Sequence, residues 1–125
     1  MSDIARLIDN YIAIWNEPDP ERRHRLIAET WSEDASYVDP LMSGEGREGI
    51  DAMVATAQGQ FPGHRFELAE GPDTHNDRVR FTWRLVPEAG GDAVAVGYDF
   101  GALAPDGRLQ EVTGFLAAAT SARTT

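Results

Sequence analysis

The hydrophobic pattern of the N-terminal half of the chain has the period of α-helices. From Ile4 to Trp15 large apolar residues recur every three or four positions, which places them on one face of a helix capped by Ser2 or Asp3. A second helix is expected from Pro20, because proline is favoured in the first turn and Asp19 is a good N-cap. Its expected buried residues are Leu26, Ile27 and Trp31.

A short strand and a third helix are expected next. Residues 35–38 are predicted to form the strand, which ends at Asp39 and Pro40. The segment 44–46, Gly-Glu-Gly, is predicted to be a loop, and the third helix then extends to about Phe61.

After residue 63 the pattern changes to the period of two that is typical of strands with one buried face. In the clearest case Phe81 and Trp83 alternate with Arg80, Thr82 and Arg84, so the arginines are expected on the outer face of the sheet. Clusters of glycine, proline and aspartate separate the strands and mark turns, at 71–77, 87–92 and 104–107. The predicted strands span residues 64–70, 78–86, 93–103 and 108–118.

Helices that precede a run of antiparallel strands indicate the α+β class, with the helices packed on one face of a curved sheet. A chain of 125 residues is the length of one domain, predicted here to span 1–120 and to be followed by a frayed tail at 121–125.

Composition restricts the possible partners. The chain has 11 basic and 21 acidic residues and a net charge of −10, which disfavours binding to nucleic acid or to anionic membranes. Cysteine is absent, and no apolar run is long enough to span a membrane. The N-terminal segment is polar and unlike a secretory signal, so a cytoplasmic location is expected. A small molecule or a protein remains as the expected partner.

Motifs for metals and nucleotides are missing from the sequence. The three histidines, His24, His64 and His75, have no metal-binding spacing, and no glycine-rich phosphate motif occurs. No serine or threonine stands in a nucleophile motif. We therefore expect neither a metal nor a cofactor.

Two aspartates are candidates for chemistry. Asp39 closes a strand and precedes Pro40, an arrangement that suits a turn but also a general base that has to be held rigidly. Asp99 shares a strand face with Gly97 and Gly101, which either leave room for a ligand or let the strand bend. If that face is buried, the pKa of Asp99 should be raised, so that its carboxyl could act as a neutral donor.

Three segments carry a resemblance to a known group of proteins: WSEDASYVDP (31–40), GREGID (46–51) and DGRLQEVTGF (106–115). They resemble the nuclear transport factor (NTF2-like) superfamily, and within it the SnoaL-like proteins and ketosteroid isomerases. The resemblance covers nearly the whole chain. It implies a cone-shaped, curved antiparallel sheet of the cystatin-like type, a half-barrel wrapped around three N-terminal helices and enclosing a deep apolar pocket. It also implies a homodimer formed through the sheet.

The resemblance implies roles for three residues. Asp39 matches the general base of the isomerases, and Tyr11 matches the tyrosine that donates to the enolate oxygen. Asp99, eight residues before Gly107, matches the second donor, an aspartic acid that stays protonated. The expected reaction is proton abstraction next to a carbonyl, giving isomerisation or cyclisation of a small apolar substrate. The residues expected to form the apolar wall are Trp31, Met53, Phe81, Trp83, Val112, Phe115 and Leu116.

Two alternatives remain open at this stage. The domain could be a non-catalytic module that binds a ligand or dimerises, because this superfamily includes such members. It could also be an epoxide hydrolase, which would require an arginine of the sheet, such as Arg80 or Arg84, to lie between two carboxylates in the pocket.

Overall fold

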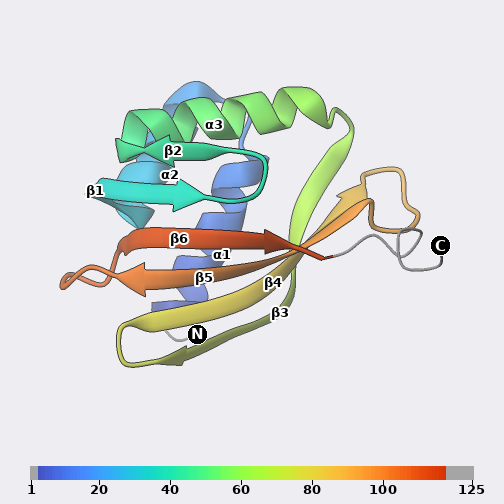
Figure 1. Cartoon of the computed structure of the whole chain (residues 1–125). Coiled ribbons are helices and arrows are strands. Elements are labelled where there is room, and N and C mark those ends of the chain that lie inside the picture. The colour runs from blue at the N-terminus through green and yellow to red at the C-terminus, as the bar shows by residue number, and fades with distance from the viewer. Residues whose placement is uncertain (1–2, 118–125) are drawn as a thin grey trace.

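The computed structural model describes residues 3–117, and these form three helices and one six-stranded sheet (Figure 1). The helices are α1 (Asp3–Asn16), α2 (Pro20–Thr30) and α3 (Gly46–Gln60). The strands are β1 (Trp31–Val38), β2 (Ser43–Glu45), β3 (His64–His75), β4 (Arg78–Pro87), β5 (Ala95–Leu103) and β6 (Leu109–Leu116). The α+β class is therefore confirmed.

The sheet has the strand order β2-β1-β6-β5-β4-β3 and is mixed. From β3 to β6 each strand pairs antiparallel with the next, as the alternating pattern predicted. The last strand, β6, however pairs parallel with β1, with Tyr37 opposite Val112. The sheet that was expected to be antiparallel is thus mixed, because local pattern identifies a strand but not its distant partner.

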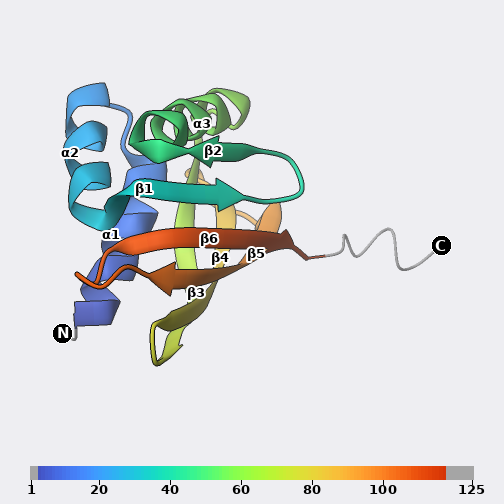
Figure 2. The ribbon, with the colours of Figure 1, turned by 60° about the vertical axis from the view of Figure 1, so that its left-hand side comes forward.

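The helices cover the concave face of the curved, unclosed sheet. Figure 1 shows α1 behind the sheet and α3 along the edge formed by β2, and Figure 2 shows α1 and α2 side by side. Contacts of α1 with β3, and of α3 with β1 and β2, hold these layers together. The buried side chains of α1 are Ile8, Tyr11, Ile14 and Trp15, the face that helical spacing predicted.

Element boundaries differ from the predicted ones at four places. Trp31 is buried as expected, but it begins β1 instead of ending α2. The segment expected to be a loop at 44–46 is divided between the end of β2 and the first residue of α3, and β3 continues through most of the turn predicted at 71–77. The strand predicted from residue 93 begins at Ala95. Ser2 and the tail at 121–125 lie outside the described residues.

The N-terminus of α2 follows its sequence signals. Pro20 is the first helical residue, and the carboxylate of Asp19 accepts a hydrogen bond from the backbone N–H of Arg22 at 3.0 Å. This contact satisfies one of the free N–H groups that every helix N-terminus carries. The predicted cap is therefore confirmed.

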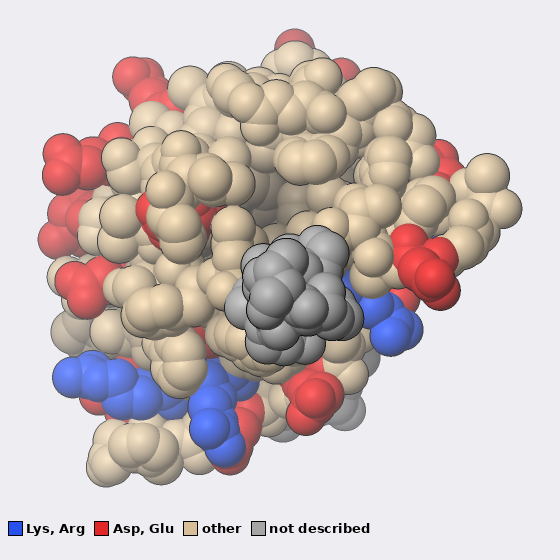
Figure 3. Space-filling view, turned by 45° about the vertical axis from the view of Figure 1, so that its right-hand side comes forward, with Lys and Arg blue, Asp and Glu red and all other residues tan. Residues whose placement is uncertain are grey.

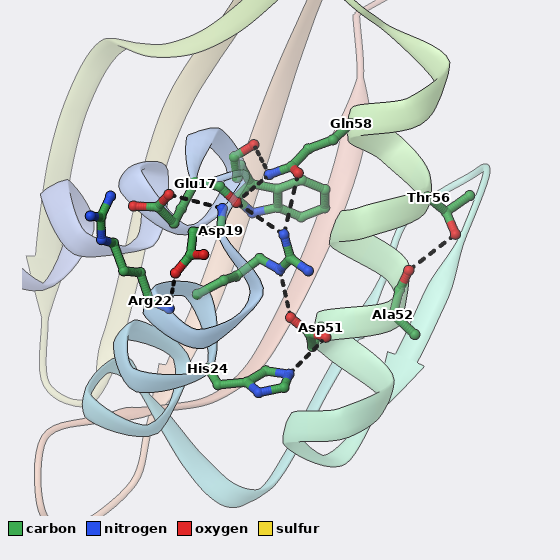
Figure 4. A network of polar contacts seen from close by, with 10 residues as sticks. Glu17, Asp19, Arg22, His24, Asp51, Ala52, Thr56 and Gln58 are labelled. Carbon is green, nitrogen blue, oxygen red and sulfur yellow. Dashed lines mark hydrogen bonds and ion pairs between the residues drawn. The ribbon is translucent and has the colours of Figure 1, made fainter.

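A buried polar network joins α2 to α3 and to the end of α1 (Figure 4). Arg23 is 4% exposed, and its Nε donates to Asp51 Oδ1 at 2.5 Å. The same guanidinium donates to the backbone carbonyl of Glu17 at 3.0 Å and to the side chain of Gln58 at 3.3 Å. His24 contacts the other carboxylate oxygen of Asp51 at 3.0 Å. The only cation buried among the described residues is therefore fully paired.

Candidate functional site

The structure contains an apolar cavity between the helices and the concave face of the sheet. It holds about 600 Å³ of empty volume, its open mouth included. Figure 3 shows that the molecule is hollowed on this side and that the visible rim of the hollow is largely uncharged. The lining residues are Tyr11, Ile12, Trp15, Tyr37, Asp39, Leu41, Met42, Ala57, Phe61, Phe66, Trp83, Leu85, Ala95, Asp99 and Leu116.

Tyr11, Asp39 and Asp99, the three candidates from the sequence, all line this one cavity. They come from α1, from the end of β1 and from the middle of β5. Tyr11 and Asp99 are each 1% exposed, and the Tyr11 hydroxyl donates a hydrogen bond to Asp99 Oδ2 at 2.7 Å. The cavity therefore contains two carboxyl groups and a tyrosine that already contacts one of them.

Asp99 lies on the concave face of β5 beneath the indole of Trp83. The Trp83 Nε1–H donates to Asp99 Oδ1 at 3.2 Å. This approach requires glycine at position 97, since a Cβ there would lie 2.1 Å from a carbon of the indole. The room that Gly97 leaves beside Asp99 is thus occupied by Trp83, and the space at Gly101 by Val79 and Leu109.

The environment of Asp99 favours the neutral carboxyl. Burial in apolar surroundings raises its pKa from 3.8 to about 6. Hydrogen bonds from Tyr11 and Trp83 lower the pKa and limit the rise, whereas the charge of Asp39 adds to it. Burial and the nearby carboxyl of Asp99 also raise the pKa of Tyr11 well above its ordinary value. Tyr11 is consequently a donor throughout the physiological range.

Asp39 serves the turn between β1 and β2 and faces the cavity at the same time. Its Oδ1 accepts backbone N–H groups of Leu41 and Met42, at 2.8 and 2.9 Å. Its Oδ2 accepts the hydroxyl of Tyr37 at 2.6 Å. A carboxylate oxygen has two lone pairs, so both on Oδ1 are engaged while one on Oδ2 remains available. Oδ2 is therefore the atom that could take a proton from a ligand.

Sequence reasoning missed Tyr37. This residue lies on β1, is 4% exposed and has a pKa raised first by burial and then by the charge of Asp99. Strand alternation could have identified it, because Tyr37 is two positions before Asp39 and so points to the same face. Its hydroxyl fixes the orientation of the Asp39 carboxylate.

Gly114 of β6 is the point on which these groups converge. A Cβ at this position would lie 2.9 Å from Asp99 Oδ1 and 3.1 Å from both Tyr37 Oη and Asp39 Cβ. Contacts below about 3 Å are essentially never seen for a real Cβ. Glycine at this position keeps open the space between the two carboxyl groups.

Only two of the seven residues expected in the apolar wall, Trp83 and Leu116, line the cavity. Trp31, Met53, Phe81 and Val112 are buried instead in the core between helices and sheet. Phe115 is 53% exposed and packs against Phe100 on the outer face. The expectation for these five residues needs correction, because alternation tells which face a side chain occupies but not whether it meets a helix or a cavity.

Arg80 and Arg84 lie on the outer face of the sheet, as expected, with side chains at least half exposed. Arg80 pairs with Asp73, and Arg84 pairs with Glu67. Neither lines the cavity that contains Asp39 and Asp99.

Within residues 3–117, no group of three or more histidine, aspartate or glutamate side chains could hold a metal ion. No helix in the same range is long and apolar enough to cross a membrane.

Comparison with known proteins agrees with this architecture. The family model of the SnoaL-like domain matches residues 8–114, so the chain belongs to the SnoaL-like family. A crystal structure from Agrobacterium tumefaciens, described as a "putative isomerase" of this family, is 47% identical, with a TM-score of 0.86. The match covers 91% of this chain and 97% of that one. Among curated proteins, none matches the sequence significantly.

More distant structures share the fold alone. One is described as a putative SnoaL-like polyketide cyclase from Jannaschia sp. CCS1, with 21% identity, a TM-score of 0.66 and coverage of 93% and 89% of the two chains. Another, from Nostoc punctiforme, has a cystatin-like fold and unknown function, with 13% identity, a TM-score of 0.69 and coverage of 94% and 90%. The cone-shaped fold implied by the sequence resemblance is thereby confirmed.

Proposed function

We propose that this protein is an isomerase or cyclase that removes a proton next to a carbonyl group, using only its own side chains. The observation that carries the proposal is the convergence of Asp39, Tyr11 and Asp99 on one apolar cavity. The similarity to an Agrobacterium protein described as a "putative isomerase" supports it. The substrate would be a small apolar carbonyl compound.

In this reaction Asp39 is the general base. Its Oδ2 takes the proton from the carbon next to the carbonyl, the C–H electrons form a C=C bond, and the carbonyl electrons move onto oxygen. Return of the proton to another carbon completes an isomerisation. In a cyclisation the enolate carbon attacks a second carbonyl, and Asp39 returns the proton to the alkoxide that forms there. Tyr37 holds the base in place through its 2.6 Å hydrogen bond.

The enolate oxygen would be stabilised by Tyr11 and by the neutral carboxyl of Asp99. When Asp99 is ionised, the single hydroxyl proton of Tyr11 is committed to Asp99 Oδ2. Protonation of Asp99 adds a donor that can be offered to the ligand. Because the pKa of Asp99 is about 6, the rate should decline as pH rises through this value.

The position of the sheet arginines favours this reaction over epoxide hydrolysis. A hydrolase of the expected type needs an arginine between two cavity carboxylates. Arg80 and Arg84 are instead on the opposite face, paired with Asp73 and Glu67.

The proposal can be tested before the substrate is known. Hydrogen–deuterium exchange at the carbon next to the carbonyl would be followed by NMR in D₂O for a panel of small cyclic ketones. Asp39→Asn should slow enzyme-dependent exchange by about 10² to 10⁴, the usual contribution of a positioned base. Tyr11→Phe should slow it by about 10² to 10³. Asp73→Asn, which removes an exposed carboxylate, is the matched control and should leave exchange unchanged.

A non-catalytic binding module would behave differently. Ketones would then bind without enzyme-dependent exchange, or the exchange would be equal in wild type and Asp39→Asn. Either result would overturn the proposed function.

A further inference from the structure

The hydrogen-bonding groups of the cavity are unevenly divided between donors and acceptors. Its side-chain donors are the Tyr11 and Tyr37 hydroxyls and the indole N–H groups of Trp15 and Trp83. Three of these four donate to the carboxyls, Tyr11 and Trp83 to Asp99 and Tyr37 to Asp39. The fourth, Trp15, lowers the pKa of Tyr11 through a side-chain hydrogen bond. With both carboxyls ionised, the side chains therefore offer a ligand mainly acceptor lone pairs.

The charges in the cavity are equally one-sided. Asp39 and Asp99 are its acidic groups, and no lysine, arginine or histidine is among the lining residues. The buried Arg23 is paired elsewhere, with Asp51. An ionised carboxyl buried without a cation is costly, and the hydrogen bonds from Tyr11 and Trp83 offset this cost only in part. A positively charged ligand would relieve the remainder.

The walls suit a cation as well. Tyr11, Trp15, Tyr37, Phe66 and Trp83 line the cavity, and successive rings along it have centroids 5.3 to 6.4 Å apart. Aromatic faces attract ammonium groups, and the attraction is larger where water is excluded. The same walls would hold the apolar body of an organic ligand.

We propose that the cavity binds small organic ammonium ions, with the charged nitrogen between the carboxyls of Asp39 and Asp99 and the apolar part against the aromatic walls. Such a cation competes with the carbonyl ligand of the proposed function for the same space. Gly114 keeps open the gap in which the nitrogen lies. The inference uses the same cavity as the proposed function but does not require Asp39 to abstract a proton.

The two ligand classes should respond to pH in opposite ways. The titratable groups that face Asp99 are Tyr11 of α1, Tyr37 of β1 and Asp39 directly after β1, and both tyrosines have raised pKa values. Asp99, with a pKa of about 6, is therefore the group that changes charge just below neutrality. Ammonium binding should strengthen as pH rises through 6, whereas the proposed enolate chemistry should weaken.

The test uses three probes of similar shape: benzylamine, benzyl alcohol and benzoate, titrated calorimetrically into the protein. At pH 7.5 benzylamine, which is protonated, should bind at least tenfold more tightly than benzyl alcohol, and benzoate should not bind. Asp99→Asn should reduce the preference for the amine to threefold or less. Asp73→Asn changes the net charge equally at an exposed site and should retain the preference.

The outcomes separate this inference from the proposed function. Equal binding of amine and alcohol, or a preference that Asp99→Asn leaves intact, would overturn the ammonium site. Should Asp99→Asn fail to fold, Asp39→Asn gives the same test, because it also removes one of the two charges. Loss of ketone exchange in Asp39→Asn alongside an unselective wild-type cavity would support the proposed function and reject the ammonium site.

Discussion

Two carboxyls of this protein, one buried and one partly buried, have opposite surroundings. Asp51 accepts hydrogen bonds from Arg23 and His24 in the network between α2 and α3 (Figure 4). Asp99, in the cavity, has neutral donors only, Tyr11 and Trp83. Burial raises the pKa of both groups, but at Asp51 the hydrogen bonds from Arg23 and His24 reverse the effect and lower it.

The difference separates a structural carboxyl from a candidate functional one. A carboxyl that is matched to a cation contributes to the fold and has little capacity left for a ligand. A carboxyl buried with neutral donors destabilises the fold when it ionises, and such groups are concentrated at functional sites. The free-energy cost of burying the ionisable carboxyl of Asp99 is understandable if that carboxyl binds the ligand or takes part in the reaction.

The largest effect on stability is expected from removing the Asp51 carboxylate that pairs with Arg23. Asp51→Ala would leave the guanidinium of Arg23 buried without its partner, which typically costs about 3 to 5 kcal/mol. Urea denaturation should show this loss in the free energy of unfolding. Asp77→Asn removes the exposed partner of Arg78 and should change stability by less than about 0.5 kcal/mol. Similar losses in both variants would contradict the structural role of the Arg23–Asp51 pair.

At Asp99 the expected effect is a dependence of stability on pH. Its folded pKa is above its ordinary value of 3.8, so the folded state binds more protons and loses stability as pH rises from about 4 to 6. A shift of this size corresponds to roughly 3 kcal/mol. Asp51 acts in the opposite sense. Because its folded pKa is below the ordinary value of 3.8, its ionised carboxylate stabilises the fold at higher pH, and this stabilisation is lost as pH falls through the folded pKa.

Subtracting the unfolding free energies of Asp99→Asn from those of wild type isolates the contribution of Asp99. The difference should change progressively between pH 4 and pH 6 and be constant above about pH 7. A difference that is constant over the whole range would show that Asp99 is not perturbed.

A smaller effect is expected where the cavity groups converge. In Gly114→Ala the new Cβ would crowd Asp99 and Tyr37, and overpacking of this kind costs about 1 to 3 kcal/mol. Thermal denaturation would measure the loss, and calorimetry should show weaker binding of benzylamine. Gly59→Ala is the matched control, since its Cβ meets nothing within 4 Å and should be neutral or slightly stabilising. Unchanged stability and binding in Gly114→Ala would argue against convergence at this point.

The smallest effect concerns the outer face of the neighbouring strands β5 and β6, opposite the cavity that contains Asp99. Tyr98, Phe100 and Phe115 are 42 to 53% exposed there, and we expect them to contact a second copy of the chain. Phe100→Ser should weaken self-association about tenfold, or about 1.4 kcal/mol, as measured by analytical ultracentrifugation. Val94→Ser, an equally exposed apolar position before the strand, should have no effect. A wild-type protein that stays monomeric at high concentration would reject this interface.

The sequence was sufficient to predict the helices and the four-stranded meander, because their apolar residues follow the periods of helix and strand. It was insufficient for the parallel pairing of β1 with β6, which joins segments more than 70 residues apart. β2 could not be predicted either, because a strand of three residues, one of them glycine, is too short to show an alternating pattern.

For the site, the sequence predicted the polar residues of the cavity well and the residues of its apolar wall poorly. Asp39, Tyr11 and Asp99 could be proposed as a set only through the family resemblance, since no local pattern connects α1, β1 and β5. Tyr37 could have been predicted from the alternation of strand residues alone. The residues that line the cavity could not be predicted in this way, because they depend on where α1 and α3 leave the sheet uncovered.

The most direct test of the contrast between the two carboxyls is an NMR titration of the aspartate side chains, labelled with ¹³C, from pH 3 to pH 8. The carboxyl of Asp99 should titrate at about pH 6, and that of Asp51 below the ordinary value of 3.8. Asp99→Asn and Asp51→Asn assign the two signals. Titration of Asp99 at or below pH 4, alongside Asp51, would contradict the account.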